Sequence, residues 1–388
     1  MKNLTYIKAA YMFDSLAGTF KQDPVVTVEN DRIVNVRFVV SSMPDNGKIV
    51  ELKGCTLMPG FIDAHDHLAL SPQLKNYPSI MADPDPILLV RSIINMKTDL
   101  YAGVTTSRCL GDRNFLDLYL KDAVNQGLIE GPRIYTCTRG LKASHAHGFV
   151  GTPFDGVEAM RAAVRENIRR GADFIKIFVT GNFRQSPWLP YYLSPQEIFT
   201  IAEEAHRAGK KVAAHCIGGE GLNQCIEQGV DIIEHAYYAT DSQIESLLKK
   251  DRWVVFTPSN NFNDARWANV SEKAVNEMRI NREEVLNSQQ KVLNSGVKFA
   301  IGTDATHGEV AEDVIFVVNT MGGTIPRALQ GISKSAAELC ELSQLIGSIT
   351  EEKKADIVAV NGVLEKDIQV LRNVCFVMKD GITVRNSL

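Results

Sequence analysis

Several features that would narrow the function at once are missing from this sequence of 388 residues. No apolar run approaches the ~18 residues that a membrane-spanning helix requires. The net charge of −4 gives no electrostatic reason to expect a nucleic-acid partner. The seven cysteines are odd in number and form no Cys-x-x-Cys motif, which is typical of a reducing compartment. Lys8 and Asp14 interrupt the first apolar stretch, which therefore does not resemble a signal peptide. We expect a cytoplasmic protein that binds neither membranes nor nucleic acids.

The pattern of the chain predicts one large α/β domain and one small β domain. Short strand-like stretches with turns occupy residues 1–56 and 351–388, and we expect both ends to form one small β-sandwich domain. Between them, apolar strands alternate with helical segments over residues 57–350, which indicates a parallel α/β arrangement. Eight strands are expected there, and the predicted fold is a (β/α)₈ TIM barrel. They cover residues 56–65, 104–110, 132–137, 173–179, 211–216, 230–235, 253–259 and 297–304.

Residue types that bind metals gather at the carboxyl ends of these strands, where barrels carry their active sites. They are His65 and His67 after strand one, Lys176 in strand four, His215 in strand five, His235 in strand six and Asp304 in strand eight. Residues two apart on a strand lie ~6.5 Å apart. Two imidazoles at that spacing can therefore bind one ion, with Zn–N bonds of ~2.0–2.1 Å. The alternative for the pair His65 and His67 is local hydrogen bonding in a core or turn.

A lysine stands in the middle of the apolar strand "ADFIKIFVTG", residues 172–181. Burial lowers the pKa of a lysine, and the neutral amine can react with carbon dioxide to give an anionic carbamate with two oxygens. Such a carbamate on Lys176 could bridge two cations. The alternatives are a lysine that extends its ammonium group to the strand end, or one that pairs with a carboxylate.

At this point the chain resembles the amidohydrolase superfamily. The matching stretches, in chain order, are "MPGFIDAHDHL", "GVTTSR", "GPRIY", "FIKIFVTG", "KVAAHC", "GVDIIEH", "GTDA", "IGSI" and "KADIVAV". The resemblance implies a binuclear site, with His65 and His67 on one metal, His215 and His235 on the other, and carboxylated Lys176 as the bridge. It also implies that Asp304 binds a metal and acts as the acid and base.

Within that superfamily the chain is most similar to the prolidase-like and carboxypeptidase-like (Xaa-Pro dipeptidase-type) members. "SHAHGFVG", "YLSPQEI" and "GTDATHGEV" carry this similarity, which implies that His147 faces the scissile carbonyl. The sequence departs from that group at "TGN" after strand four, where Thr-Gly-Gly is expected, at "SHAHG" after strand three, and at "GIS" before the last barrel helix. These loops contact the substrate, so the departures concern specificity.

We therefore predict a metal-dependent hydrolase that cleaves an amide or peptide bond of a small substrate, such as a dipeptide or N-acyl amino acid. A hydroxide that bridges two divalent ions would attack the carbonyl, and Tyr237 or Tyr238 could bind the oxyanion. The imidazole-rich ligand set suits zinc, with manganese or iron as alternatives. A phosphotriesterase or lactonase with the same binuclear centre is the alternative activity, and a scaffold without catalysis is a further one. We also expect a homo-oligomer.

Overall fold

The computed structural model describes residues 4–38, 47–72, 74, 77–148, 150–182, 189–267 and 272–388. The chain divides into two compact units. The first contains residues 1–63, 97–107 and 308–388, and the second contains residues 64–96 and 108–307. The division falls inside two strands, β6 (Phe61–Asp66) and β7 (Val104–Cys109). No described helix is both long enough and apolar enough to cross a bilayer.

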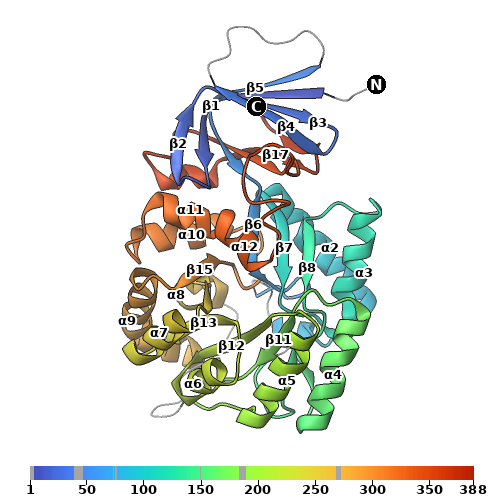
Figure 1. Cartoon of the computed structure of the whole chain (residues 1–388), viewed down its shortest axis with the longest axis vertical. Helices are drawn as coiled ribbons and strands as arrows, with labels where there is room; N and C mark the ends of the chain where they lie inside the picture. Colours follow the sequence, from blue (N-terminus) through green and yellow to red (C-terminus); the bar gives the residue numbers. More distant parts are fainter. Residues whose placement is uncertain are drawn as a thin grey trace. The chain divides into compact units, whose positions relative to one another are not determined.

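Both ends of the chain contribute strands to one sheet of the first unit (Figure 1). The order is β18-β17-β16-β5-β1-β3-β4, and β2 pairs with β1. These strands are β1 (Leu4–Asp14), β2 (Thr19–Gln22), β3 (Pro24–Glu29), β4 (Arg32–Phe38), β5 (Lys48–Pro59), β16 (Ile357–Asn361), β17 (Val374–Lys379) and β18 (Ile382–Asn386). One hydrophobic cluster includes Ile7, Val26 and Leu57 from the N-terminal strands and Ile357 and Phe376 from the C-terminal strands. The two ends of the chain are thus held together by a common core as well as by hydrogen bonds.

The second unit contains a seven-stranded sheet of order β10-β9-β11-β12-β13-β14-β15, in which all strand pairs are parallel. Its strands are β9 (Leu141–Lys142), β10 (Thr152–Pro153), β11 (Ile175–Phe178), β12 (Val212–Gly218), β13 (Ile232–Tyr238), β14 (Trp253–Phe256) and β15 (Lys298–Ile301). Residues of β11, β12 and β14 are buried throughout, as expected for parallel strands covered on both faces.

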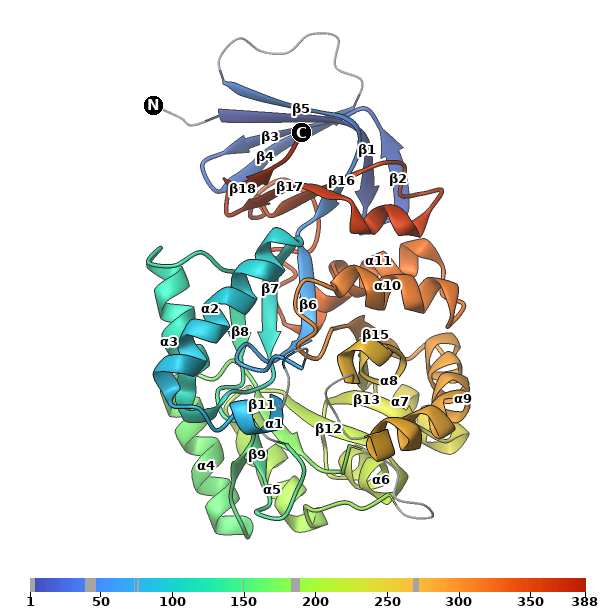
Figure 2. The same cartoon turned by 180° about the vertical axis from the view of Figure 1, so that it is seen from behind.

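Helices follow the strands along the chain, and α4 and α5 lie side by side next to the sheet of the second unit (Figure 2). The helices are α1 (Tyr77–Ile80), α2 (Asp85–Tyr101), α3 (Leu116–Asn125), α4 (Val157–Arg170), α5 (Pro195–Arg207), α6 (Gly219–Glu227), α7 (Asp241–Lys249), α8 (Ser259–Phe262), α9 (Glu272–Asn294), α10 (Val310–Asn319), α11 (Ile325–Gly331) and α12 (Lys334–Leu339). A capping box of Ser194 and Glu197 starts α5. Gly171 ends α4 with φ 110°, a conformation that favours glycine.

All eight strands predicted for the large domain are present, but several differ from their predicted extents. The first begins later, the sixth ends three residues later, at Tyr238, and the seventh and eighth end three residues earlier, at Phe256 and Ile301. Strands one to three correspond to β6, β7 and β8 (Arg133–Thr136), which form a three-stranded sheet, and strands four to eight correspond to β11 to β15. The predicted first strand, residues 56–65, is wrong in its beginning, because Gly60 separates β5 from β6. At Gly60 a Cβ atom would lie 2.1 Å from Oγ1 of Thr105, so only glycine fits this break.

Candidate metal centre

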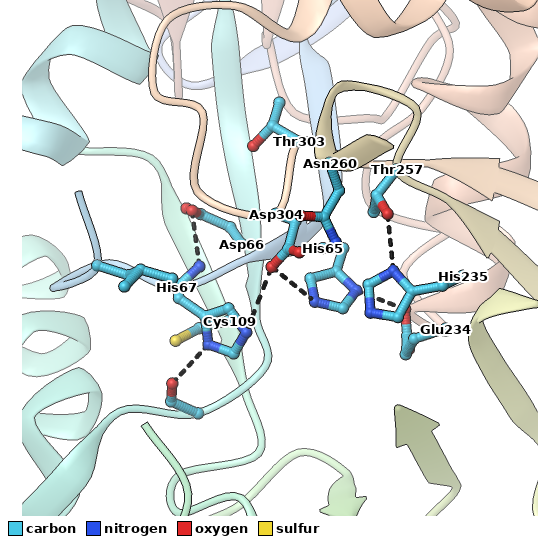
Figure 3. A network of polar contacts seen from close by, with 12 residues as sticks. His65, Asp66, His67, Cys109, Glu234, His235, Thr257, Asn260, Thr303 and Asp304 are labelled. Carbon is cyan, nitrogen blue, oxygen red and sulfur yellow. Dashed lines mark hydrogen bonds and ion pairs between the residues drawn. The ribbon is translucent and has the colours of Figure 1, made fainter. Parts of the chain in front are cut away.

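The polar side chains from the strand ends meet around one cavity, which lies entirely within the second unit. Figure 3 shows His65 and His67 directed at Asp304. The cavity encloses about 510 Å³ including its mouth. Predicted site residues on its wall are His65, His67, His147, His215, His235 and Asp304. The structure therefore brings together five of the six predicted metal ligands and His147, whereas Lys176 and Tyr237 do not contribute to the wall.

The carboxylate of Asp304 lies at the centre of this group. Its Oδ1 is 3.4 Å from Nε2 of His65 and 3.7 Å from Nε2 of His67. The ring of His235 is centred 4.9 Å from that of His65 and 4.7 Å from that of His215. His65, His235 and Asp304 each offer a ligand atom, and these atoms lie within 4.8 Å of one another. Such spacing allows several of these atoms to bind the same ion.

Backbone carbonyls fix the orientation of two of these imidazoles. Nδ1 of His67 lies 2.8 Å from the carbonyl oxygen of Gly111, and Nε2 of His215 lies 3.2 Å from that of Gly181. A carbonyl oxygen only accepts hydrogen bonds, so these ring nitrogens carry the proton. The second nitrogen of each neutral ring then keeps its lone pair, as a metal ligand must.

Burial keeps four of the histidines on the cavity wall uncharged. It lowers the pKa of His67 to about 3 and that of His147 to about 4. The same cause holds the pKa values of His215 and His235 well below the ordinary value. Neutral imidazole is the form that binds a metal ion, because protonation removes the lone pair.

Lys176 is completely buried, and its Nζ has no hydrogen-bond partner in the described part of the chain. The amine lies 5.0 Å from the centre of the Phe178 ring. Burial lowers the pKa of Lys176 to about 8, so about a tenth of the amine is neutral at pH 7, far more than for an exposed lysine. A partly deprotonated amine with no other bond fits the predicted carbamate, which requires a free lone pair on nitrogen.

Glu234 is a buried residue of the centre that the sequence analysis did not select. Its Oε2 lies 2.8 Å from Nδ1 of His65, and its Oε1 accepts a hydrogen bond of 2.9 Å from Nη1 of Arg108. Strand alternation would direct Glu234 away from the side on which His235 lies. His235 has a φ of 78°, however, so the strand is not extended there, and both side chains reach His65. The only sequence signal was a glutamate inside an apolar strand.

The charge of Glu234 determines the tautomer of His65. Burial alone would raise the pKa of Glu234, but Arg108 and His65 lower it to about 2. The ionised carboxylate accepts the Nδ1–H of His65, so Nε2, which lies 3.4 Å from Oδ1 of Asp304, is the nitrogen left to bind a metal ion. Arg108 is itself held by the carbonyl oxygen of Ala64, at 2.8 Å. A chain of two hydrogen bonds thus fixes the first predicted metal ligand.

The backbone at Asp304 approaches β6 closely. Its amide donates to the carbonyl oxygen of His65 at 2.8 Å, and a Cβ atom at Gly302 would lie 2.3 Å from the nitrogen of His65. Glycine in "GTDA" is therefore required to bring Asp304 to the histidines. Burial would raise the pKa of Asp304, but His65 and Arg266 hold it well below the ordinary value. The carboxylate is ionised and able to accept a proton.

The predicted oxyanion donors, Tyr237 and Tyr238, are not among the residues that line this cavity. The hydroxyl of Tyr237 is 3.0 Å from Oγ1 of Thr257 and accepts from Nδ2 of Asn260, also at 3.0 Å. Thr257 in turn lies 2.7 Å from Nδ1 of His235, so this network supports the imidazole. Tyr238 lines a different pocket, beside α9. Contact of either tyrosine with an oxyanion stays a prediction.

Comparison with known proteins places the chain in a family. The model of the amidohydrolase family matches residues 56–384. The sequence is 28% identical over 351 residues to ochratoxinase of Aspergillus niger, across 81% of this chain and 72% of that protein. A structure of a Xaa-Pro dipeptidase with bound methionine superposes with a TM-score of 0.87 at 24% identity, covering 99% of this chain and 100% of the other. A prolidase complexed with N-methylphosphonate-L-proline gives 0.86 at 25% identity, with the same coverage.

The family match and the hydrolases among its relatives show an enzyme that hydrolyses C–N bonds. The chain belongs to the amidohydrolase family, because the match extends over most of its length. The similarity to prolidase-like members that the sequence motifs predicted is confirmed.

Replacement of Glu234 by Gln should weaken metal binding about 10- to 100-fold, the usual effect of removing a group that orients a ligand. Glutamine has nearly the same shape but no charge, so it accepts the His65 proton less strongly. Competition with a chromophoric zinc chelator measures the affinity, and melting curves of the metal-loaded variant verify its fold. Glu227→Gln, on the exposed side of α6, is the matched control. Equal affinities of Glu234→Gln and wild type would show that this carboxylate does not support the ligand.

Proposed function

We propose that the protein is a metal-dependent hydrolase that cleaves the amide bond of a small dipeptide or N-acyl amino acid. The observation that carries this proposal is the cavity in which neutral histidines converge on Asp304, near a buried lysine that has no hydrogen-bond partner among the described residues. Family membership supports the reaction class, and the cavity supplies side chains that could bind the metal ions and transfer the proton.

We infer that the eight strands close as a (β/α)₈ barrel within residues 57–350, with the small β domain built from residues 1–56 and 351–388. The parallel register from β11 to β15 supports this inference. Two backbone hydrogen bonds also support it. Asp173 donates to the carbonyl oxygen of Thr136 at 2.8 Å, which joins the start of β11 to the end of β8. Asp304 donates to His65, which joins the end of β15 to β6.

The residues of the cavity fit a pair of divalent ions, which we expect to be zinc because imidazole and carboxylate ligands suit it. His65 and His67 would hold one ion, His215 and His235 the other, with Asp304 as a further ligand. Carbon dioxide bound as a carbamate on Lys176 would supply the bridging oxygens. Bound ions of this kind lower the pKa of water and polarise a carbonyl group.

Asp304 and His147 have the protonation states that the proposed reaction needs. Asp304 is ionised, so it can accept a proton from the attacking water and return it to the leaving amine. His147 is neutral and lies on the cavity wall, its ring centred 4.9 Å from that of His215. A neutral imidazole carries one N–H, which can donate to the carbonyl oxygen of a bound amide.

Apolar side chains complete the wall of the cavity. They are Leu70, Val150, Phe178 and Trp267, and they suit the apolar part of a small substrate. Asn182 also lies on the wall, at the position in "TGN" where the prolidase-like pattern has glycine. A carboxamide in place of a hydrogen atom narrows the cavity and adds a hydrogen-bonding group. We therefore expect a substrate preference that differs from that of the prolidase-like group.

A screen tests the substrate class. Dipeptides and N-acyl amino acids should be hydrolysed by metal-loaded protein with kcat/KM above about 10⁴ M⁻¹ s⁻¹, the lower end of the usual enzyme range. Phosphotriesters and lactones, included in the same screen, should be poor substrates. A reversed order of preference would favour the phosphotriesterase or lactonase activity.

Protein purified without chelators should carry about two divalent ions per chain, measured by elemental analysis. Lys176→Met should lose most of this metal and the activity, because methionine fills a similar space but offers no carbamate. In Lys176→Ala, which leaves more room, propionate should restore part of both by supplying two carboxylate oxygens. Wild-type metal content and turnover in Lys176→Met would contradict the role of the carbamate.

Asp304→Asn should lower turnover of amides by ~10²–10⁴, the usual contribution of general acid–base catalysis. Activated esters should be affected less, because their leaving groups need no proton. Turnover of a matched amide and activated ester is measured together with metal content, which should fall only modestly. Equal losses on both substrates at unchanged metal content would remove the role of Asp304 in protonating the amine.

A further inference from the structure

The segment after β14 places a buried cation against the carboxylate of strand eight. Arg266 belongs to the short helical turn η2 (Asp264–Trp267) and is only 4% exposed. It lines the same cavity as the predicted ligands. None of the predicted ligands comes from strand seven, so the segment after this strand, which carries Arg266, needs another role in the cavity.

The guanidinium group of Arg266 is almost fully engaged by the loop after β15. Nη2 donates to the carbonyl oxygen of Asp304 at 2.5 Å and lies 3.6 Å from its Oδ2. Nη1 donates to Oγ1 of Thr306 and, at 3.4 Å, to the carbonyl oxygen of Thr303. Three hydrogen bonds and one ion pair thus join the terminal nitrogens to residues 303–306. The remaining nitrogen, Nε, is buried and has no hydrogen-bond partner in the described part of the chain.

This arrangement does not fit a group that anchors a substrate carboxylate. Bidentate binding of a carboxylate uses two parallel N–H donors of one arginine. In Arg266 both terminal nitrogens already donate to the loop and Nε is buried, so a substrate carboxylate would have to compete with residues 303–306 for these donors. An arginine on a cavity wall would otherwise be the first candidate for substrate recognition.

The backbone that Arg266 contacts is in an unusual conformation. Asp304 has a φ of 54° and the next residue, Ala305, a φ of 68°, the left-handed region that residues other than glycine rarely adopt. Such a conformation persists only where the surrounding contacts enforce it. The Asp304 amide is held by the carbonyl oxygen of His65, and its carbonyl group is held by Arg266.

We propose that Arg266 is a positioning residue, which fixes the left-handed backbone of Asp304 and thereby aims its carboxylate at the reacting centre. This inference rests on the proposed function, in which Asp304 transfers the proton. Arg266 acts through Asp304 and touches the substrate only as part of the wall. The segment after strand seven therefore serves the proton transfer as well as the shape of the cavity.

Arg266→Gln should lower kcat for an amide about 10²-fold, the cost of misplacing a catalytic group by about 1 Å, with little change in KM. Arg266→Lys keeps the charge but not the fork of donors and should give an intermediate loss; it also serves if the glutamine variant does not fold. Arg282→Gln is the matched control. Arg282 donates from α9 to the carbonyl oxygen of Asn261 at 2.6 Å, so it anchors the same segment without touching Asp304. Its kcat should stay near wild type.

Millimolar guanidinium should restore part of kcat in Arg266→Ala, whereas methylammonium should not, because only the planar ion reproduces the fork. An increase of KM at unchanged kcat in Arg266→Gln would overturn the proposal and assign Arg266 to substrate binding. An equal loss in Arg282→Gln would also overturn it, since a general loosening of the segment would then be the cause.

Crystal structures of the wild type and Arg266→Gln test the same inference without any substrate. The proposal expects Asp304 to leave the left-handed region in the variant, and an unchanged φ near 54° would overturn it. If the wild type hydrolyses no amide and Asp304 still moves, the proposed function fails and the positioning role of Arg266 stands.

Discussion

The need to stabilise buried charges is the constraint on which the candidate metal centre depends. Arg108, Lys176 and Glu234 are all completely buried, and removal of each charge from water costs several kcal/mol. Arg108 and Glu234 offset this cost by pairing at 2.9 Å, whereas Lys176 lowers it by giving up its proton more readily. Glu234 also accepts the His65 proton, so one ion pair stabilises the buried charges and orients a ligand. Loss of the pairing would therefore affect folding and metal binding together.

The sequence predicted much of the site because its ligands end apolar, parallel strands. The carboxyl ends of such strands meet at one edge, so His65, His215 and His235 could be placed together before their distances were known. Lys176 stood out because a cation inside an apolar strand needs a chemical reason. The extent of the first strand was predicted less well. "TLMPGFIDAH" is apolar throughout, and the pattern does not show that the chain changes sheets at Gly60.

Glu234 and Arg266 could not be found in the same way, because both depend on irregular backbone. Alternation along β13 would place Glu234 and His235 on different faces of the strand. The positive φ of His235 interrupts this alternation, so both side chains reach His65. Arg266 lies in a turn that has no hydrophobic period, so no pattern relates it to strand eight. Tyr237 is the opposite case, a residue that the sequence analysis selected for the cavity but that does not line it. It follows His235 by two residues, yet its hydroxyl binds Thr257 and Asn260 instead of facing the cavity.

The strand ends and the connecting segments of this molecule are constrained in different ways. Strand ends position the predicted metal ligands, which form hydrogen bonds to neighbouring strands and turns, such as those of His65 to Glu234 and His67 to Gly111. Connecting segments supply most of the remaining wall, including Asn182 and Trp267, and these are free to vary without disturbing the ligands. The segment after β14 is an exception, because Arg266 ties it to the backbone of Asp304. A substitution there that reshapes the cavity would also move Asp304, the carboxylate proposed to transfer the proton. Substrate preference and turnover should therefore be coupled at this segment more than at the loop that carries Asn182.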